Sequence, residues 1–466
     1  MAEYKDSMYL GLSKASTLDA ELKRQSAYIS LGLLALLFPF VPKWVIVLGV
    51  LLGVIVIVYI PKDSLIFRAL ASERDKEAGV LIGPLKFSFA ILMLAILVVT
   101  LDFPVYVLAA TIGVVAFGEG AAALVNLLVS RNRALFWSVT LLILGTLFGF
   151  IFGGWAMVNM GMGTASLDLM FFLAVIGTVT GALLYTIVDE ENIAIPLGAG
   201  MTMWLFSSFS YPRVPGAAEI VIAVTFPLII GMASYKLAAA DLSGALAGVL
   251  SGLLMILFGG IGWFVLLLVF FFMGTIFTKY KYAYKLAVGA AQPKEGSRGY
   301  RNVFGNCLVP LVLVVAYGAI GDFKAPLLGE VDRAAFIIGY LGAMATATAD
   351  TLASEIGSTY RGQPRMITTL KRVSAGTDGA VSVLGEAAAL FGAAAIALVA
   401  IPMGVAGPDA AATIILTMLG GFVGTNVDSV LGATLQRKRL LTNEGVNFFA
   451  TLAGGALSMA LYLFVH

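Results

Sequence analysis

Long apolar runs alternate with short polar or glycine- and proline-rich segments along almost the whole chain. A run of about 15 to 25 apolar residues can cross a bilayer as a helix, and the chain contains fifteen such runs. They fall at residues 27–41, 43–60, 84–101, 103–128, 134–157, 167–188, 193–209, 217–235, 241–257, 260–277, 303–320, 333–349, 380–401, 410–425 and 446–465. The pattern predicts an all-α polytopic membrane protein with about 15 transmembrane helices.

The basic residues between these runs predict the orientation of the chain. If the N-terminus is inside the cell, 25 of the 29 Lys and Arg residues lie on cytoplasmic segments, and the remaining four are Lys43, Arg213, Lys324 and Arg333. Cytoplasmic loops of membrane proteins carry such an excess, so we predict a cytoplasmic N-terminus. Residues 1–25 are polar and lack the pattern of a signal peptide, which indicates a cytoplasmic tail.

The order of apolar runs and polar clusters repeats once. The same order occurs in spans one to seven and in spans nine to fifteen. Each set begins with two helices, a long basic inner loop and two more helices whose inner end is acidic or glycine-rich. Two further helices follow, then an inner loop with an acid and an asparagine, and a last helix. An offset of eight spans gives both halves the same orientation. We therefore predict two parallel seven-helix pseudo-repeats, residues 26–210 and 241–466, joined by one linker helix within residues 211–240.

The amino-acid composition excludes several classes of function and site. Hydrophobic residues make up 60% of the chain and charged residues 12%, and the net charge of +2 is too small to indicate nucleic-acid binding. The single cysteine, Cys307, lies in an apolar run, and the single histidine, His466, is the last residue. Disulfides, zinc sites and histidine acid/base catalysis are therefore not expected. The 52 glycines favour close helix packing, within a monomer or a homodimer.

The densest polar chemistry lies between residues 345 and 382, at ends of spans that we predict to be cytoplasmic, where nucleotides are available. On a helix, Asp350, Ser354 and Gly357 share one face, and Glu355 is offset by one position. Ionisable residues at a membrane are costly, which makes them candidates for a functional site. The alternative is a helix end with a capping acid.

The segment from Lys371 and Arg372 through Gly376, Thr377 and Gly379 to Ser382 leads into the thirteenth span. Glycines let backbone amides approach a phosphate, the N-terminus of a helix favours anions, and the basic pair adds positive charge. The alternative is an ordinary N-cap formed by Thr377 or Asp378. The segment is not a Walker A motif, because no Gly-Lys-Ser/Thr follows.

Two further clusters flank this segment. One follows the fourteenth span and contains Asp428, Gln436, Asn443, Glu444 and Asn447. Carboxylates on facing helix ends form a plausible oxygen-ligand set for Mg²⁺ carrying a nucleotide, and the candidate ligands are Asp350, Asp428, Glu355 and Glu444. The alternative is that these polar residues join helix faces of small residues. The other cluster is basic and contains Lys279, Lys285, Lys294 and Arg298, a pattern that by itself favours lipid headgroups or topology.

Five motifs give the second half a resemblance to a known family. They are GTIFTKYKYAYK from Gly274, EGSRGYRNVFGN, ATATADTLASEIG, GTDGAVSVLGE, and DSVLGATLQ with LTNEGVN. Together, over about Asp241 to His466, they resemble the membrane-protein family that contains the plant phytyl-phosphate kinase and the animal transmembrane protein 19.

The first half is more faintly similar to the phytol kinase and dolichol kinase family, through Arg24, Glu73-Arg74, Gly118-Glu119-Gly120 and Asp189 to Pro196. It departs from that family at Gln25 and Tyr28, where a Lys and a His are expected, and at Glu119, where an Asp is expected. A phosphate loop has no counterpart between Arg131 and Leu147. We interpret this half as a degenerate copy.

The resemblance of the second half implies a kinase that transfers a phosphoryl group from a nucleoside triphosphate, with CTP favoured, to an isoprenoid monophosphate such as geranylgeranyl or phytyl phosphate. The carboxylate set described above predicts Mg²⁺ as cofactor, and the predicted orientation of the chain puts the site on the cytoplasmic face of the cell membrane. The site residues carried over are Lys279, Arg298, Asn306, Asp350, Ser354, Glu355, Gly376, Thr377, Gly379, Ser382, Asp428, Gln436, Asn443 and Asn447. Asp350, Glu355, Asp428, Lys279 and Arg298 are the catalytic candidates among them.

Three alternatives remain at this stage. A related enzyme that phosphorylates a free prenol or makes a CDP-lipid would carry the same motifs. A transporter fits the parallel repeat, although transporters place polar residues near the bilayer midplane and here they lie at the cytoplasmic ends. A non-enzymatic membrane scaffold fits only the degenerate first half.

Overall fold

The computed structural model describes residues 22–71, 73–129, 132–209, 214–292, 296–319, 323–325 and 329–465. The predicted cytoplasmic tail therefore lies outside the described residues, apart from residues 22–25, which belong to a helix that runs to residue 32. The chain forms two compact units, residues 1–209 with 214–217 and residues 210–213 with 218–466. Each unit is described by itself.

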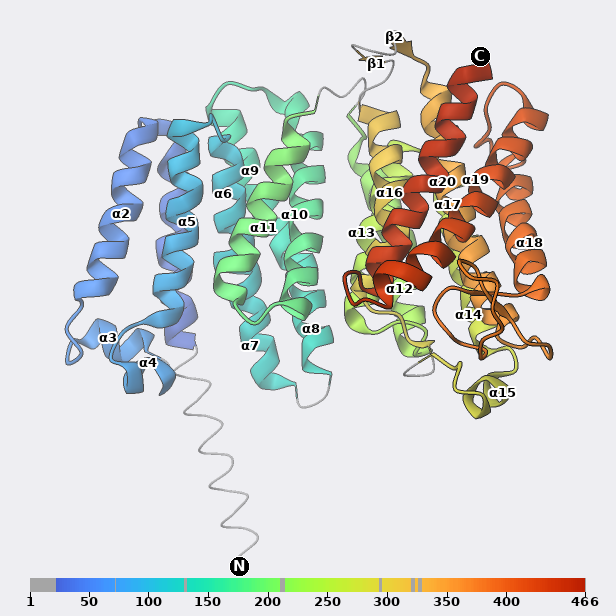
Figure 1. The fold of residues 1–466 in the computed structure, drawn as a ribbon. Coiled ribbons are helices and arrows are strands. Elements are labelled where there is room, and N and C mark those ends of the chain that lie inside the picture. Colours follow the sequence, from blue (N-terminus) through green and yellow to red (C-terminus); the bar gives the residue numbers. More distant parts are fainter. Residues whose placement is uncertain are drawn as a thin grey trace, which may run out of the picture. The chain divides into compact units, whose positions relative to one another are not determined.

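The first unit is a bundle of helices (Figure 1). After the helix at residues 22–32 come a 3₁₀ helix at Leu33–Phe40, α2 (Lys43–Tyr59), α3 (Leu65–Leu70), α4 (Glu73–Ala78), α5 (Ile82–Thr100), α6 (Val105–Ile112), a π-helix at Gly113–Glu119, α7 (Gly120–Leu128), α8 (Arg133–Thr140), a π-helix at Leu141–Gly145, α9 (Thr146–Asn159), a 3₁₀ turn at Thr164–Ser166, α10 (Leu167–Ile187) and α11 (Glu191–Ser207). The segments α6 to α7 and α8 to α9 each run as one continuous helical rod through their π-helical turns.

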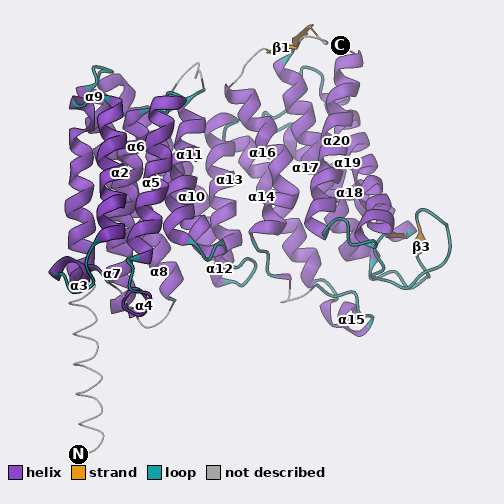
Figure 2. Ribbon diagram, turned by 60° about the vertical axis from the view of Figure 1, so that its left-hand side comes forward, coloured by secondary structure: helices purple, strands orange, loops and turns teal. Residues whose placement is uncertain are grey.

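The second unit is also helical, and loops gather at both of its ends (Figure 2). Its elements are α12 (Ala217–Lys236), α13 (Leu242–Phe258), α14 (Ile261–Lys279), α15 (Tyr282–Ala287), α16 (Tyr300–Ala319), β1 (Phe323–Ala325), β2 (Gly329–Val331), α17 (Arg333–Gly357), β3 (Arg365–Met366), β4 (Ala380–Val381), α18 (Val383–Ala400), α19 (Ala410–Leu431), a π-helix at Gly432–Gln436, and α20 (Asn443–Val465). The strands form two short antiparallel ladders, β1 with β2 and β3 with β4.

Every predicted span contains a described helix, so the predicted all-α architecture is confirmed. Within the described residues, eleven helical segments are long and apolar enough to cross a membrane. They are Ile82–Thr100, Val105–Leu128, Arg133–Asn159, Leu167–Ile187, Ala217–Lys236, Ile261–Lys279, Tyr300–Ala319, Arg333–Gly357, Val383–Ala400, Ala410–Gln436 and Asn443–Val465. The helices Lys43–Tyr59 and Leu242–Phe258 are apolar but shorter. The count of fifteen spans, the cytoplasmic N-terminus and the parallel repeat stay predictions.

Helix α17 is the centre of the second unit and contacts α14, α16, α18, α19 and α20. Small residues let its neighbours approach closely. The hydroxyl of Thr346 donates to the carbonyl of Gly420 on α19 at 3.2 Å, and a Cβ added at Gly424 would lie 2.5 Å from the Cγ2 of Thr346. A Cβ added at Gly454 on α20 would lie 2.7 Å from the carbonyl oxygen of Gly420. Such packing of small residues is typical of helices that associate within a membrane.

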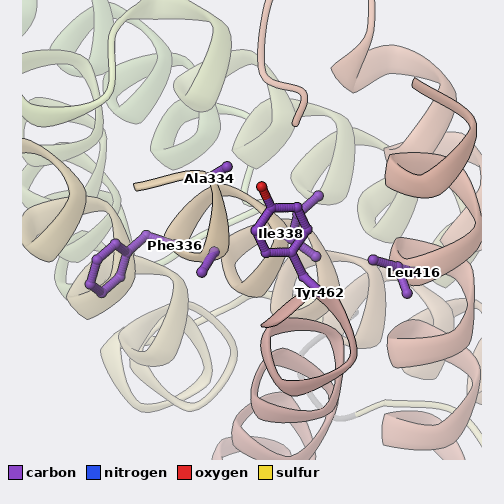
Figure 3. Close-up of a cluster of buried hydrophobic side chains, with 6 residues drawn as sticks. Ala334, Phe336, Ile338, Leu416 and Tyr462 are labelled. Atoms are coloured by element: carbon purple, nitrogen blue, oxygen red, sulfur yellow. The ribbon is translucent and has the colours of Figure 1, made fainter. Parts of the chain in front are cut away.

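The two ends of α17 differ in chemistry. At its start, Ala334, Phe336 and Ile338 pack with Leu416 of α19 and Tyr462 of α20 in a buried apolar cluster (Figure 3). The helix begins at the N-cap Asp332, whose carboxylate accepts from the backbone N–H of Ala334 at 3.0 Å. The C-terminal end of α17 carries the polar residues. The apolar cluster packs the N-terminal end of α17 against α19 and α20.

Candidate functional site

The polar end of α17 lies at the end of the second unit that also carries α15 and the loop with β3 and β4 (Figures 1 and 2). The predicted span stopped at residue 349, but the helix continues as regular α-helix to Gly357. Asp350, Ser354 and Glu355 therefore all lie on one helix, which does not unwind between them. Ser354 is exposed, whereas Glu355 is buried. The two acids consequently face different surroundings.

Asp350 of α17 and Asp428 of α19 lie side by side, as the sequence predicted. Each carboxyl group is the other's direct neighbour. The Oδ2 atom of Asp428 is buried and accepts no hydrogen bond from the described residues. Asp378, on the loop before α18, adds a third negative charge close to Asp428. Adjacent carboxylates repel unless a proton or a cation lies between them, so this pair is suited to hold a cation.

The glycine turn before α18 packs directly against α19. Gly376 and Gly379 have φ angles of +79° and +76°, which favour glycine. A Cβ at Gly379 would lie 2.5 Å from the backbone nitrogen of Ala433 and 2.6 Å from the carbonyl oxygen of Ser429, and a Cβ at Gly376 would lie 3.1 Å from the Cβ of Ala290. Both glycines are thus required so that the turn can pack against its neighbouring segments. This packing positions Asp378 beside the aspartate pair.

We expect Gly379→Ala to detach this turn from α19, because the new Cβ has no room and the backbone is strained. Left-handed backbone at a non-glycine residue costs about 1–3 kcal/mol. The measurement is the rate of tryptic cleavage after the exposed Lys371 and Arg372 in the purified protein, which should rise. Gly404→Ala is the matched control, since Gly404 has a φ of +68° with no atom within 4 Å of its added Cβ. Equal cleavage rates in Gly379→Ala and the wild type would contradict the packing.

Ser382 is the N-cap of α18. Its hydroxyl accepts from the backbone N–H of Gly385 at 3.1 Å, so the cap is neither Thr377 nor Asp378, the alternatives that the sequence suggested. Thr377 donates instead to the carbonyl of Ser374 at 2.8 Å. The helix begins at Val383, three residues later than the predicted span, because the chain first pairs as β4 with β3. The predicted phosphate-binding role of Thr377 and Ser382 stays a prediction.

Glu355 is part of a buried ion pair with Lys285. The ammonium of Lys285, on α15, pairs with Oε2 of Glu355, and it also donates to the carbonyls of Phe277 at 2.9 Å and Thr278 at 2.7 Å. The hydroxyl of Thr278 donates to Oε1 of Glu355 at 3.1 Å. Lys285 is fully buried and Glu355 is 3% exposed. Both oxygens of Glu355 are therefore engaged, and the pair fastens α15 and the end of α14 to α17.

Arg298 lies in an apolar environment beside this ion pair. Its guanidinium stacks over the rings of Phe270 and Phe271, with its central carbon 5.1 and 5.8 Å from the ring centroids. Burial lowers the pKa of Arg298 from its ordinary value, and the negative charge of Glu355 opposes that change. Arg298 also lines an almost entirely apolar cavity of about 70 Å³ between α12, α13, α14 and α16. The other two basic candidates differ, since Lys279 is exposed and Lys294 lies outside the described residues.

The remaining candidates lie on α16, on or just before α20, and on the loop between β3 and β4. The Nδ2 of Asn447 approaches Oδ1 of Asn306 at 3.5 Å, which joins two buried amides 141 positions apart. A Cβ at Gly305 would lie 2.9 Å from the carbonyl oxygen of Glu444, so the start of α20 packs on α16. Gln436 ends the π-helix after α19 and is half-buried, and Asn443 is the exposed first residue of α20. Lys371 and Arg372 are exposed on the loop.

Comparison with known proteins gives the family. The model of the integral membrane protein family DUF92 matches residues 225–455. An uncharacterized membrane protein of Methanocaldococcus jannaschii is 30% identical over 244 residues, which are 52% of this chain and 94% of the relative. The chain belongs to the DUF92 family. It is thus a multi-pass membrane protein, and the cell membrane in particular stays a prediction.

Two plant relatives extend the comparison. The Arabidopsis thaliana protein PGR is 31% identical over 283 residues, covering 53% of this chain and 98% of the relative. The chloroplastic protein VTE6 of the same plant is 30% identical over 241 residues, covering 51% of this chain and 67% of the relative. No solved structure matches the chain. The matched family region lies in the second half, so the lipid-kinase resemblance of the first half stays a prediction.

In this DUF92 protein the described residues contain no group of three His, Cys, Asp or Glu side chains that could hold a metal ion. Glu355 is held by Lys285 and Thr278, and Asp378 is exposed. Of the four predicted ligands, the structure brings Asp350 and Asp428 together, and the metal-ligand role of Glu444 stays a prediction. That set suits Mg²⁺, which proteins usually hold through one or two carboxylates together with substrate phosphates and water.

Sequence reasoning missed three residues of this DUF92 site. Lys285 was included in a basic cluster for which lipid contact was favoured, yet it is the most deeply buried charge of the second unit. Thr278 and Asp378 were not singled out as site residues. No pattern in the sequence indicated this burial, because the neighbours of Lys285 on its short helix, Tyr284 and Leu286, are exposed. Its partner Glu355 is 70 positions away. Only the fold pairs them.

Proposed function

We propose that this chain is a membrane kinase that transfers a phosphoryl group from a nucleoside triphosphate, CTP in the first instance, to an isoprenoid monophosphate such as geranylgeranyl or phytyl phosphate. The resemblance of the second half to the family of the plant phytyl-phosphate kinase supplies the reaction class. The observation that carries the proposal is the pair Asp350 and Asp428, with the unsatisfied buried Oδ2 of Asp428.

The aspartate pair is the proposed metal and nucleotide side of the site. Asp350 and Asp428 would hold Mg²⁺, and the ion would supply positive charge that neutralises the transferred phosphoryl group. The two carboxylates come from α17 and α19, whose close packing fixes their separation. Asp378 on the glycine turn would add negative charge beside this site. The positive N-terminal end of α18 lies after this turn and favours the triphosphate.

Arg298 and its cavity are the proposed acceptor side. The guanidinium of Arg298 at the wall of this apolar cavity suits the anionic head of an amphiphile. The cavity of about 70 Å³ is far smaller than a typical ligand pocket of about 300–1,000 Å³, so the hydrocarbon tail would extend between helices into the bilayer. The electrostatic interaction between Arg298 and Glu355 links this cavity to the polar end of α17. An isoprenoid phosphate has that combination of head and tail.

The proposed reaction needs no general base. An oxygen of the acceptor monophosphate attacks the terminal phosphorus of the triphosphate, the bond to the bridging oxygen breaks, and a nucleoside diphosphate leaves with that oxygen. A phosphate monoester is already ionised near neutral pH, because its second pKa is about 6. Catalysis then consists of positioning and charge neutralisation, which fits a chain whose one histidine is its last residue.

The test is an assay of the purified full-length protein in detergent with Mg²⁺, CTP or ATP, and geranylgeranyl monophosphate. We expect conversion to the diphosphate with stoichiometric release of the nucleoside diphosphate. Geranylgeraniol and phosphatidic acid are the comparison substrates, because phosphorylation of the free prenol or release of pyrophosphate from CTP would replace the proposal with a prenol kinase or a CDP-lipid synthase. Absence of any product with both nucleotides and all acceptors would overturn it in favour of a transporter or scaffold.

A further inference from the structure

The first unit contains a polar cavity of about 300 Å³ that the proposed kinase reaction does not use. This volume is at the lower end of the range for small-molecule pockets, about 300–1,000 Å³. The cavity lies among the helix at residues 22–32 and helices α5, α7, α8 and α11 with their connecting segments. Its charged and aromatic lining residues are Arg24, Tyr28, Asp75, Lys86, Phe87, Glu119, Trp137, Asp189, Glu190 and Glu191.

Glu119 is the residue that indicates a ligand. It ends the π-helix Gly113–Glu119, and such π-helical turns within α-helices are frequent at functional sites. Its Oε2 atom is buried and accepts no hydrogen bond from the described residues. The charge that acts on it is that of Glu191, the first residue of α11, which is also negative. A buried carboxylate without a donor and beside a second carboxylate is costly unless a cation or a proton accompanies it.

Among the described residues that line the cavity, acidic side chains outnumber basic ones. Lys86 forms an ion pair with Glu190. The Oδ1 of Asp75 accepts from the backbone N–H of Ile82 at 2.8 Å. Five acidic side chains and two basic ones line the cavity, so the surplus is negative. The cavity therefore favours a cationic ligand over a phosphate.

The size and walls of the cavity favour an organic cation over a bare metal ion. A volume of about 300 Å³ is about ten times the share of one water molecule in the liquid, which is about 30 Å³. The rings of Tyr28 and Phe87, 6.4 Å apart, and of Trp137 line the space. Aromatic faces attract ammonium groups.

We propose that this cavity binds a small ligand bearing an ammonium group, with the carboxylates of Glu119 and Glu191 accepting its hydrogen bonds. An ammonium has three donors and no acceptor, which matches two neighbouring carboxylates. The ligand is either a free amine or the ethanolamine headgroup of a phospholipid. This site would make the first unit a binding module, and the proposal does not depend on the kinase activity of the second unit.

The experiment is calorimetric titration of the full-length protein, purified in a non-ionic detergent, with ethanolamine. Ethylene glycol, which replaces the ammonium by a hydroxyl, is the neutral comparison. We expect one ethanolamine per chain and no heat with ethylene glycol. Glu119→Gln keeps the shape of the side chain and should weaken binding about tenfold or more, the effect of losing one hydrogen bond between charged groups. Asp168→Asn, an exposed acid in the first turn of α10, is the matched control and should bind as the wild type does.

A second set of titrations distinguishes the two sources of the ammonium. In nanodiscs of phosphatidylethanolamine the headgroup would compete and weaken ethanolamine binding relative to nanodiscs of phosphatidylglycerol, whereas a site for a free amine binds equally in both. Glu191→Gln, judged for folding by circular dichroism, replaces Glu119→Gln if the latter does not fold. Absence of ethanolamine binding in detergent and in phosphatidylglycerol, equal binding by the wild type and both variants, or binding of Mg²⁺ that displaces ethanolamine would each overturn the proposal.

Discussion

Asp350→Asn and Asp428→Asn are each expected to lower kcat for isoprenoid-phosphate phosphorylation by about 10²–10³-fold, the usual effect of removing one electrostatic stabiliser of a transition state. The two carboxyl groups are direct neighbours, and one oxygen of Asp428 is buried without a hydrogen-bond donor. Asparagine has the same shape but no negative charge, so it should preserve packing while weakening the hold on Mg²⁺. The measurement is the steady-state rate at several Mg²⁺ concentrations, where the variants should need more Mg²⁺ to reach half of their maximal rate.

Asp409→Asn is the matched control for this experiment. Asp409 lies at the other end of α19, where it is exposed and caps the helix by accepting from the backbone N–H of Ala411 at 2.7 Å. Asparagine is as good an N-cap as aspartate, so this variant loses the same charge on the same helix and should keep its activity. Wild-type kinetics in Asp350→Asn would remove the aspartate pair from the proposed mechanism.

Lys285→Met should destabilise the second unit by about 3–5 kcal/mol, the usual effect of removing one partner from a buried ion pair. The substitution leaves Glu355 buried with its negative charge and only the hydroxyl of Thr278 as donor. In the double variant Lys285→Met/Glu355→Leu no charge remains, and most of the lost free energy should return. The measurement is the free energy of unfolding in mixed micelles as a function of the mole fraction of sodium dodecyl sulfate.

The same double variant tests the role of Glu355. Because both of its oxygens are engaged by Thr278 and Lys285, we expect Glu355 to position helices, so that the folded double variant keeps measurable kinase activity. Loss of activity at wild-type stability would instead support the metal-ligand role that the sequence suggested. Lys438→Met, at an exposed lysine after α19, is the control for loss of a positive charge and should change the unfolding free energy by less than about 0.5 kcal/mol.

Hydropathy was sufficient to locate the helices, because a span must be apolar along its whole length. It was least accurate where helices leave the apolar region. Helix α17 extends eight residues beyond the predicted end at residue 349, and α19 with its π-helix extends to Gln436 beyond the predicted end at residue 425. The added turns carry Asp350, Glu355 and Asp428. A hydropathy window ends at the first charges, whereas the backbone continues its hydrogen bonds through them.

The candidate site was predictable in part. The pairing of Asp350 with Asp428 followed from two acids on helices that both end on the same side, and the structure places them side by side. The role of Ser382 as N-cap was not predicted, since the capping position depends on where β4 ends and the helix begins. The cavity around Glu119 was also not predicted. The first unit departs from the lipid-kinase motifs, but a changed motif does not show whether a polar space remains.

The sequence by itself was sufficient for the helical membrane architecture and the family motifs, because both depend on composition and local sequence. It also indicated the aspartate pair, because both acids lie at helix ends that meet at one end of the second unit. Only the tertiary structure decided three features. They are the partner of Glu355, the close contact with α19 that requires a glycine at position 379, and the cavity of the first unit. The first two features join residues 70 and 54 positions apart, and the residues that line the cavity are up to 168 positions apart. Burial and close packing arise between helices, so no pattern along one helix can specify them.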